Sequence, residues 1–225
     1  MTAKDPSGPG RWLNDERAVR RREDSDGIGR LLTGIGYYGL GQLCLLAWPM
    51  IYLIYQAPLA FVEAKAAAAV SFGLVPFLVG LFRGRYVAVG RPWPALTANT
   101  LGTDAGYGAY LTRSVYLSCT LGLATYAGTA VHVLAGSWVL NVLVAAGITV
   151  GGIALLPYLS TGSTEARVAR GGYYALSLAV VAVGAAPLDT SVGDPILGPA
   201  LFALLVGLAL LDLRPLPGTG DGRTP

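Results

Sequence analysis

Residues 113–134 form a run long enough to cross a membrane, and they include polar side chains that could do chemistry. The run is apolar and long enough to cross a bilayer. Placed on a helix at about 100° per residue, it carries small polar residues and the chain's single histidine on one face. This polar stripe consists of Ser114, Ser118, Gly122, Thr125, Thr129 and His132. Two interpretations fit it: a polar path or binding surface in which His132 exchanges protons near neutral pH, and a packing face that brings helices together.

A second apolar run begins at Ser137 and carries Asn141 near its start, which we add to the candidate residues. At about 1.5 Å per residue, Asn141 lies about 6 Å into this run, and His132 lies about 4 Å before the end of the previous one. The hairpin therefore predicts that the two side chains face each other near the outer membrane surface. A histidine with an asparagine is not a catalytic pair, and the neighbouring sequence supplies no acid or metal ligand.

Motifs of the common hydrolytic and phosphotransfer enzymes are missing from the sequence. It contains no serine-nucleophile loop, no HExxH zinc motif, no P-loop and no aspartate-rich phosphotransfer motif. Cys44 and Cys119 lie inside apolar runs, where we expect buried, reduced thiols. We therefore predict a protein that is not an enzyme, with no catalytic residue, no bound metal and no cofactor.

The overall composition points to the bilayer as the solvent. Of the 225 residues, 53% are hydrophobic and 13% charged, whereas about 25% are charged in an ordinary soluble domain. The mean hydropathy is +0.55. A net charge of +3 gives no indication of a nucleic-acid partner. The excess of arginine over lysine, with abundant alanine, glycine and valine, suggests a GC-rich prokaryotic genome. The first thirty residues are polar and charged, so we expect no cleavable signal peptide.

Apolar runs predict an all-α integral membrane protein, a bundle of six transmembrane helices within residues 34–211. The expected spans are about 34–55, 62–82, 114–134, 137–159, 173–186 and 195–211. The last two are short for a full crossing. Residues 1–33 are expected to form a cytoplasmic tail with a short charged helix, and residues 212–225 a disordered cytoplasmic tail. Ser163 predicts the cap of an interfacial helix that Gly171 ends before the fifth span.

Basic residues predict the orientation of these spans. If the N-terminus is cytoplasmic, fifteen of the sixteen lysines and arginines fall on the cytoplasmic side, and only Lys65 lies outside. Both termini are therefore expected inside. The arginines near the inner surface set this topology, and they are also candidates for contacts with anionic lipid headgroups. They are Arg83, Arg85, Arg91, Arg113, Arg167 and Arg170.

Two functions remain open from the sequence. One is a non-enzymatic structural or accessory subunit of a prokaryotic cell membrane, whose contacts are the lipid bilayer and either a membrane-protein partner or a homo-oligomer. The other is a small permease for a neutral or weakly polar solute that uses the polar stripe. The permease requires a cavity near the middle of the membrane lined by Thr125, Thr129, Asn141 or Thr149. A packed bundle, with these side chains bonded to neighbouring carbonyls, favours the subunit.

Overall fold

The described part of the chain is entirely helical. A computed structural model describes residues 27–57, 61–87, 104–161, 163–189 and 194–214, and no strand occurs in these ranges. The helices are α2 (Ile28–Thr33), the π-helix η1 (Gly34–Gly41), α3 (Gln42–Leu46), α4 (Trp48–Gln56), α5 (Phe61–Arg83), α6 (Asp104–Ala135), α7 (Trp138–Leu159), α8 (Thr164–Gly184) and α9 (Leu197–Asp212). The all-helical class predicted from the apolar runs is confirmed for these residues. Both predicted tails lie largely outside them.

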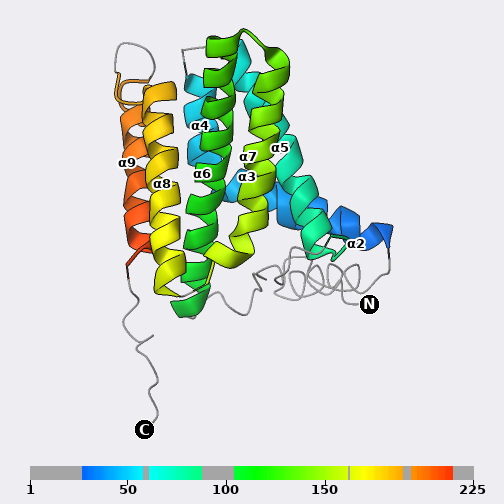
Figure 1. Cartoon of the computed structure of the whole chain (residues 1–225). Helices are drawn as coiled ribbons and strands as arrows, with labels where there is room; N and C mark the ends of the chain where they lie inside the picture. The colour runs from blue at the N-terminus through cyan, green and yellow to red at the C-terminus, as the bar shows by residue number, and fades with distance from the viewer. Residues whose placement is uncertain (1–26, 58–60, 88–103, 162, 190–193, 215–225) are drawn as a thin grey trace, which may run out of the picture.

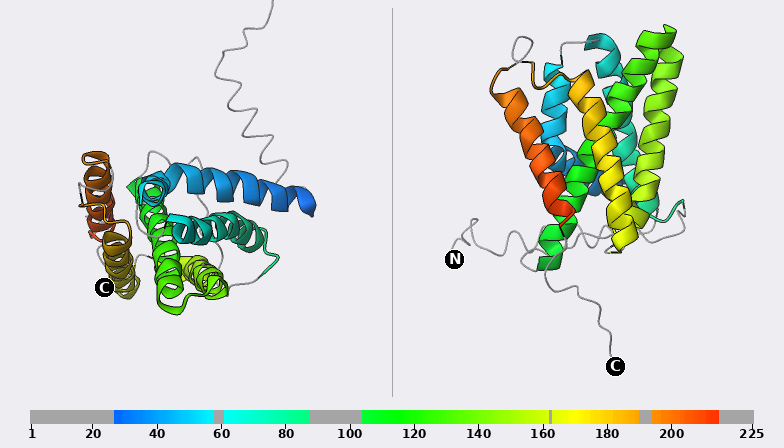
Figure 2. Two further views of the ribbon diagram at one scale, coloured as in Figure 1. Left: turned by 90° about the horizontal axis from the view of Figure 1, so that it is seen from above. Right: turned by 60° about the vertical axis from the view of Figure 1, so that its left-hand side comes forward.

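The first predicted span, 34–55, is not one straight helix. The chain is helical from Ile28 to Leu46, turns by 62° at Ala47, and continues as α4. Pro49 lies in the first turn of α4, where it has no N–H to bond the carbonyl four residues earlier, so a continuous helix is broken. Figure 1 shows the resulting arm of α2, η1 and α3 projecting from the lower part of the bundle, and the left view of Figure 2 shows its length.

Helices α5 and α7 match the predicted spans 62–82 and 137–159 within one residue at each end. The third span differs at its start: α6 begins at Asp104, ten residues before the predicted position 114, in a stretch that we expected to be a loop. Residues 88–103, which include Arg91, lie outside the described part of the chain. The predicted hairpin of α6 and α7 is present.

Within the described ranges, three helices are long and apolar enough to cross a membrane: Val62–Arg83, Gly108–Ala135 and Trp138–Leu159. The arm and α4 together make a fourth candidate if the bent pair is one span. Helix α6 lies at the centre, because 67% of its most apolar stretch is buried, compared with 39% for α5 and 33% for α7. It contacts α3, α4, α5, α7, α8 and α9. The helix with the polar stripe is therefore the one around which the others pack.

Helix α8 runs through the glycines that were predicted to end an interfacial helix. Ser163 is its N-cap, as predicted, and its hydroxyl accepts a hydrogen bond from the Ala166 N–H at 3.2 Å. The helix continues past Gly171 and Gly172 to Gly184. A glycine costs a helix about 1 kcal/mol, which the buried face of α8 offsets by packing on the bundle. The predicted end of a helix at Gly171 is therefore wrong, because α8 is one continuous helix.

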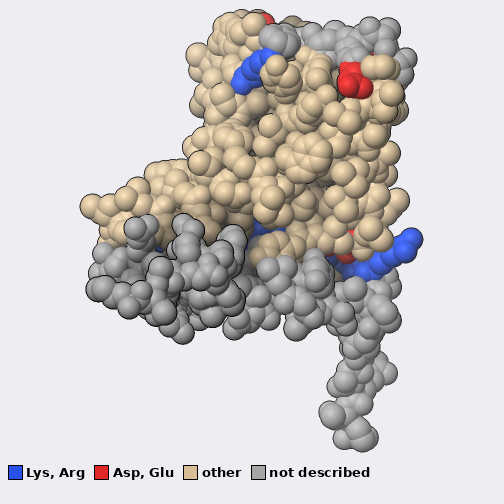
Figure 3. Space-filling view, turned by 180° about the vertical axis from the view of Figure 1, so that it is seen from behind, with Lys and Arg blue, Asp and Glu red and all other residues tan. Residues whose placement is uncertain are grey.

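Charged side chains are unevenly distributed over the surface. On the face shown in Figure 3, the described lysines, arginines and acidic residues lie near the two ends of the bundle, and a broad uncharged band separates them. Large apolar side chains are exposed along α7, among them Val139, Leu143 and Leu155. Such a band is what a hydrocarbon environment requires.

Candidate functional site

The N-terminal end of the polar stripe holds the arm against α6. The Ser114 hydroxyl donates a hydrogen bond to the Leu46 carbonyl at 2.7 Å. One residue earlier, Arg113 Nη1 donates to Gln42 Oε1 at 2.7 Å, and Arg113 is only 5% exposed. Burial against α3 leaves its guanidinium facing the protein interior. The lipid-headgroup contact predicted for Arg113 does not agree with this position.

The middle of the stripe lies where α6 approaches α7 and α8. Thr120, which the stripe did not include, bonds the Tyr116 carbonyl and the Tyr173 hydroxyl, each at 2.8 Å. The Tyr116 hydroxyl donates to the Gly152 carbonyl at 2.8 Å. Ser118 and Thr125 are fully buried, and within the described residues their hydroxyls have no hydrogen-bond partner. This part of α6 is thus closely packed but not fully hydrogen-bonded.

One threonine on α6 and one on α7 are bonded to carbonyls of their own helices. The Thr129 hydroxyl donates to the Thr125 carbonyl at 2.7 Å. On α7, the Thr149 hydroxyl lies 2.7 Å from the Ala145 carbonyl and 2.9 Å from the Ser71 hydroxyl of α5. Thr149 is fully buried, as is Ser71. These hydroxyls therefore serve contacts within and between helices.

His132 and Asn141 both contact Glu63, at the start of α5. His132 Nε2 lies 3.8 Å from Glu63 Oε1, and Asn141 Nδ2 donates to the Glu63 carbonyl at 3.1 Å. The structure thus brings the two predicted residues to one neighbour. The expectation that no acid lies beside His132 is wrong, because α5 packs against the α6–α7 hairpin and places there a residue distant in sequence. The His132 ring also lies 4.5 Å from the Trp138 ring, centre to centre.

Close backbone packing fixes Asn141. A Cβ on Gly128 of α6 would lie 2.6 Å from Asn141 Oδ1 and 2.9 Å from its carbonyl oxygen. Asn141 is fully buried, and its Oδ1 accepts no hydrogen bond from the described residues. A glycine at position 128 is therefore required for α7 to approach this closely.

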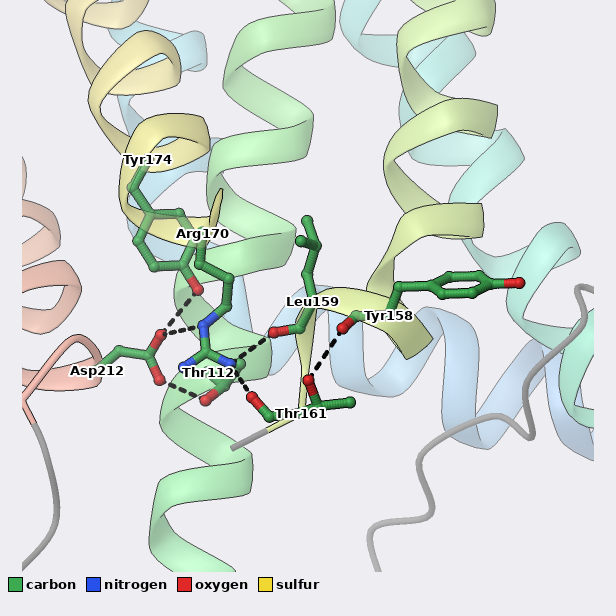
Figure 4. Close-up of polar contacts among 7 residues, drawn as sticks. All are labelled: Thr112, Tyr158, Leu159, Thr161, Arg170, Tyr174 and Asp212. Atoms are coloured by element: carbon green, nitrogen blue, oxygen red, sulfur yellow. Dashed lines mark hydrogen bonds and ion pairs between the residues drawn. The ribbon is translucent and has the colours of Figure 1, made fainter. Parts of the chain in front are cut away.

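A second polar cluster, at the end of the bundle where α8 begins and α9 ends, joins these two helices to the rest of the bundle (Figure 4). Arg170 Nε lies 3.3 Å from Asp212 Oδ2, and the two side chains are only 7% and 3% exposed. Arg170 Nη1 also donates to the carbonyls of Leu159, at 2.6 Å, and Thr161, at 3.2 Å. The guanidinium is thus held by the end of α7 and by α9. Arg170 is a buried structural cation, and its predicted lipid-headgroup contact is wrong.

Asp212 has further partners in this cluster. The Tyr174 hydroxyl donates to its Oδ2 at 3.0 Å, and the Thr112 hydroxyl of α6 donates to its Oδ1. The sequence placed Asp212 only at the start of a tail. Its position directly after an apolar run could have indicated a role in the sequence, since an aspartate that is buried there needs a partner.

The other predicted headgroup residues have different surroundings. The Arg83 guanidinium carbon lies 3.2 Å from the centre of the Tyr38 ring on η1, a cation–π contact that ties the arm to α5. Arg85 is exposed, with a positive φ of 59°, and Arg167 is half-buried. Of the predicted headgroup arginines that the structure describes, Arg85 is therefore the most exposed.

An open groove lies between α4, α5 and α6, away from the stripe's hydroxyls. Its volume is about 330 Å³, and Ile51, Ile54, Tyr55, Lys65, Ala68, Ala69, Phe72 and Leu121 line it. Thr125, Thr129, Asn141 and Thr149 are not among these residues. Within the described ranges, no three histidine, cysteine, aspartate or glutamate side chains group as metal ligands do. Cys119 is buried as predicted, whereas Cys44 is exposed on the arm.

Comparison with known proteins gives a family but no activity. A family model described as a domain of unknown function, DUF8215, matches residues 25–163, more than half of the chain. The chain belongs to the DUF8215 family. No curated protein and no solved structure matches it. The DUF8215 match covers the arm, α4 to α7 and the Glu63 contacts, and it stops at Ser163, the N-cap of α8. Arg170 and Asp212 therefore join two further helices to the DUF8215 region.

Proposed function

We propose that this DUF8215 protein is a non-enzymatic, multi-pass membrane protein that serves as a structural or accessory subunit of a prokaryotic cell membrane. One observation carries the proposal: three buried polar side chains of α6 and α7 are bonded to helix carbonyls. Thr129 and Thr149 bond carbonyls of their own helices, and Asn141 bonds a carbonyl of α5. The groove lies elsewhere, with an almost entirely apolar lining. Serine, threonine and asparagine commonly join membrane helices in this way.

The proposed topology has six crossings with both termini in the cytoplasm. Helix α8 carries Glu165, Arg167 and Arg170 in its first two turns, which leaves residues 171–184 as its apolar part. At about 1.5 Å per residue this part spans about 21 Å, less than the hydrocarbon core of about 30 Å. The ion pair with Asp212 supports a deeper position for Arg170, since a paired charge can enter a less polar environment. Figure 1 shows α8 and α9 side by side and roughly parallel to α6.

Cysteine labelling in whole cells tests this topology. In a variant lacking Cys44 and Cys119, single cysteines are placed at Ser137, Ser163 and Asp194, in the turns before α7, α8 and α9. We expect a membrane-impermeant maleimide to label Ser137→Cys and Asp194→Cys in intact cells, and Ser163→Cys only after lysis. Equal labelling at Ser163 and Asp194 in intact cells would show that α8 does not cross. Recovery of the chain in the soluble fraction would reject the membrane location.

The subunit role is tested on the full chain extracted from its own membranes in a mild detergent. We expect it to elute with a protein partner in fixed proportion or as an oligomer of itself, and reconstituted vesicles to show no increase in solute flux. A solitary monomer together with solute flux would overturn the subunit role.

A small permease is the second candidate, and the buried, unbonded hydroxyls of Ser118 and Thr125 favour it. Buried polar atoms of this kind need water or another polar ligand to satisfy them. The test is swelling of vesicles that contain the protein, with glycerol and urea as neutral solutes. A permease requires faster swelling than in empty vesicles, and Thr125→Val should slow it. Unchanged swelling rules out this function for these solutes.

A further inference from the structure

The groove between α4 and α5 has a shape that suits one hydrocarbon chain. Ile54 and Leu121 form a buried floor, and the small side chains of Ala68 and Ala69 leave space that larger residues would fill. Tyr55 and Lys65 stand at one end, and Phe72 lies toward the other. Apart from these polar groups at one end, the lining is apolar, as in other sites that bind extended apolar ligands.

The part of α5 that lines the groove fits within one leaflet of a bilayer. From Lys65 to Phe72 is seven residues of α5, or about 10.5 Å at 1.5 Å per residue. One leaflet contributes about 15 Å to a hydrocarbon core of about 30 Å. Lys65 lies one turn from the start of α5, so the groove extends from the membrane boundary toward its middle. A lipid tail entering from the side would lie along α5.

The charge at the end of the groove selects the headgroup. Lys65 Nζ lies 5.1 Å from the centre of the Tyr55 ring. An ammonium carries three N–H donors, so it can lie over the face of an aromatic ring and bind an anionic oxygen at the same time. The nearest acid on the same helix, Glu63, is two residues away on the other side of α5, where it contacts His132 and Asn141. Lys65 is thus the cationic member of the groove lining.

We propose that this groove binds one anionic phospholipid, with an acyl chain between Ile54, Ala68, Ala69 and Phe72 and its phosphate at Lys65. The site rests on the proposed membrane location of α5. The site lies at the end of the bundle opposite the arginine-rich end. Its cation, Lys65, is the one lysine or arginine that the predicted topology places on the outer side.

Photo-crosslinking to the full chain in lipid nanodiscs tests this site. The probe is phosphatidylglycerol with a diazirine in one acyl chain, compared with phosphatidylcholine carrying the same chains. We expect adducts on α4 and on the first half of α5, with a yield about fivefold higher for the anionic lipid. Lys65→Gln should remove this preference, and Lys65→Arg should keep it. Ala69→Leu should lower the yield of both lipids by filling the groove.

Two matched variants control for general effects. Arg214→Gln removes an exposed charge at the opposite end of the bundle, and Ala175→Leu enlarges an exposed alanine on α8; both variants should keep the crosslinking yields and the lipid preference of the original protein. The proposal is overturned if Lys65→Gln keeps the preference for phosphatidylglycerol, or if Ala69→Leu leaves both yields unchanged. If either of these crosslinking results is found while cysteine labelling still shows a membrane protein, the lipid site is rejected and the membrane location stands. Recovery in the soluble fraction rejects both proposals.

Discussion

Arg170 on α8 and Asp212 on α9 form a buried ion pair, with 3.3 Å between Arg170 Nε and Asp212 Oδ2. Each partner also has hydrogen bonds to other parts of the bundle: Arg170 to the end of α7, and Asp212 to Tyr174 and Thr112. Removing one member therefore leaves an uncompensated charge and several unbonded groups.

Asp212→Ala is expected to destabilise the protein by about 3–5 kcal/mol, because it leaves Arg170 buried without its counter-charge. The double variant Arg170→Met with Asp212→Leu should recover most of this loss, since it removes both charges. The measurement is chemical unfolding of the purified protein in detergent. Arg214→Met, at an exposed position near the same end, serves as the control and should have little effect. A single variant as stable as the original protein would contradict a structural role for the pair.

Gly39→Ala should separate the arm from α5. The ideal Cβ of residue 39 lies 2.5 Å from the Pro76 Cα and 2.7 Å from its carbonyl oxygen, and these backbone atoms cannot rotate away. We expect a loss of about 1–3 kcal/mol in unfolding free energy. Gly36 lies on the same π-helix with no atom within 4 Å of its ideal Cβ, so Gly36→Ala should be neutral or slightly stabilising. Equal effects of the two substitutions would show that the arm does not pack on α5 in this register.

Gly128→Ala should disturb the α6–α7 hairpin at Asn141, because the added methyl group meets Asn141 Oδ1 and the Asn141 carbonyl. The expected loss is again about 1–3 kcal/mol. Gly147→Ala is the matched control, since no atom lies within 4 Å of its ideal Cβ on the exposed face of α7. Thermal unfolding in detergent compares the two variants. If Gly147→Ala is the more damaging change, α7 must pack through its other face.

Asp194 should make the stability of α9 depend on pH in the acid range. Its Oδ1 accepts hydrogen bonds from the N–H groups of Ile196, at 2.9 Å, and Leu197, at 2.8 Å. The bonds from Leu197 and Ile196 hold the pKa of Asp194 below its ordinary value. The carboxylate therefore stabilises the fold above the pKa of the unfolded chain, and this contribution is lost as the pH falls through the lower folded-state pKa.

Unfolding measured from neutral pH to about pH 3 checks this expectation against Asp194→Ala. The original protein should be the more stable at neutral pH, and the difference should shrink in acid. A constant difference across this range would mean that the cap does not depend on the charge.

The sequence by itself determined the helical class and the positions of α5, α7 and the Ser163 cap. These depend on local properties: a run of apolar residues of sufficient length, and a serine hydroxyl three residues before the N–H that it accepts from. The face of α6 could also be assigned, because helical periodicity fixes which of its residues lie together.

Only the tertiary structure decided which partners meet those residues. Glu63 lies beside His132 because the start of α5 packs against the α6–α7 hairpin, and Asp212 lies beside Arg170 because α9 returns to the N-terminal part of α8. The continuity of α8 through Gly171 is likewise set by packing, which outweighs the local cost of a glycine in a helix, whereas the break at Ala47 follows a local signal, Pro49. Contacts between distant residues depend on how helices are arranged in space, and no local pattern in the chain encodes that arrangement.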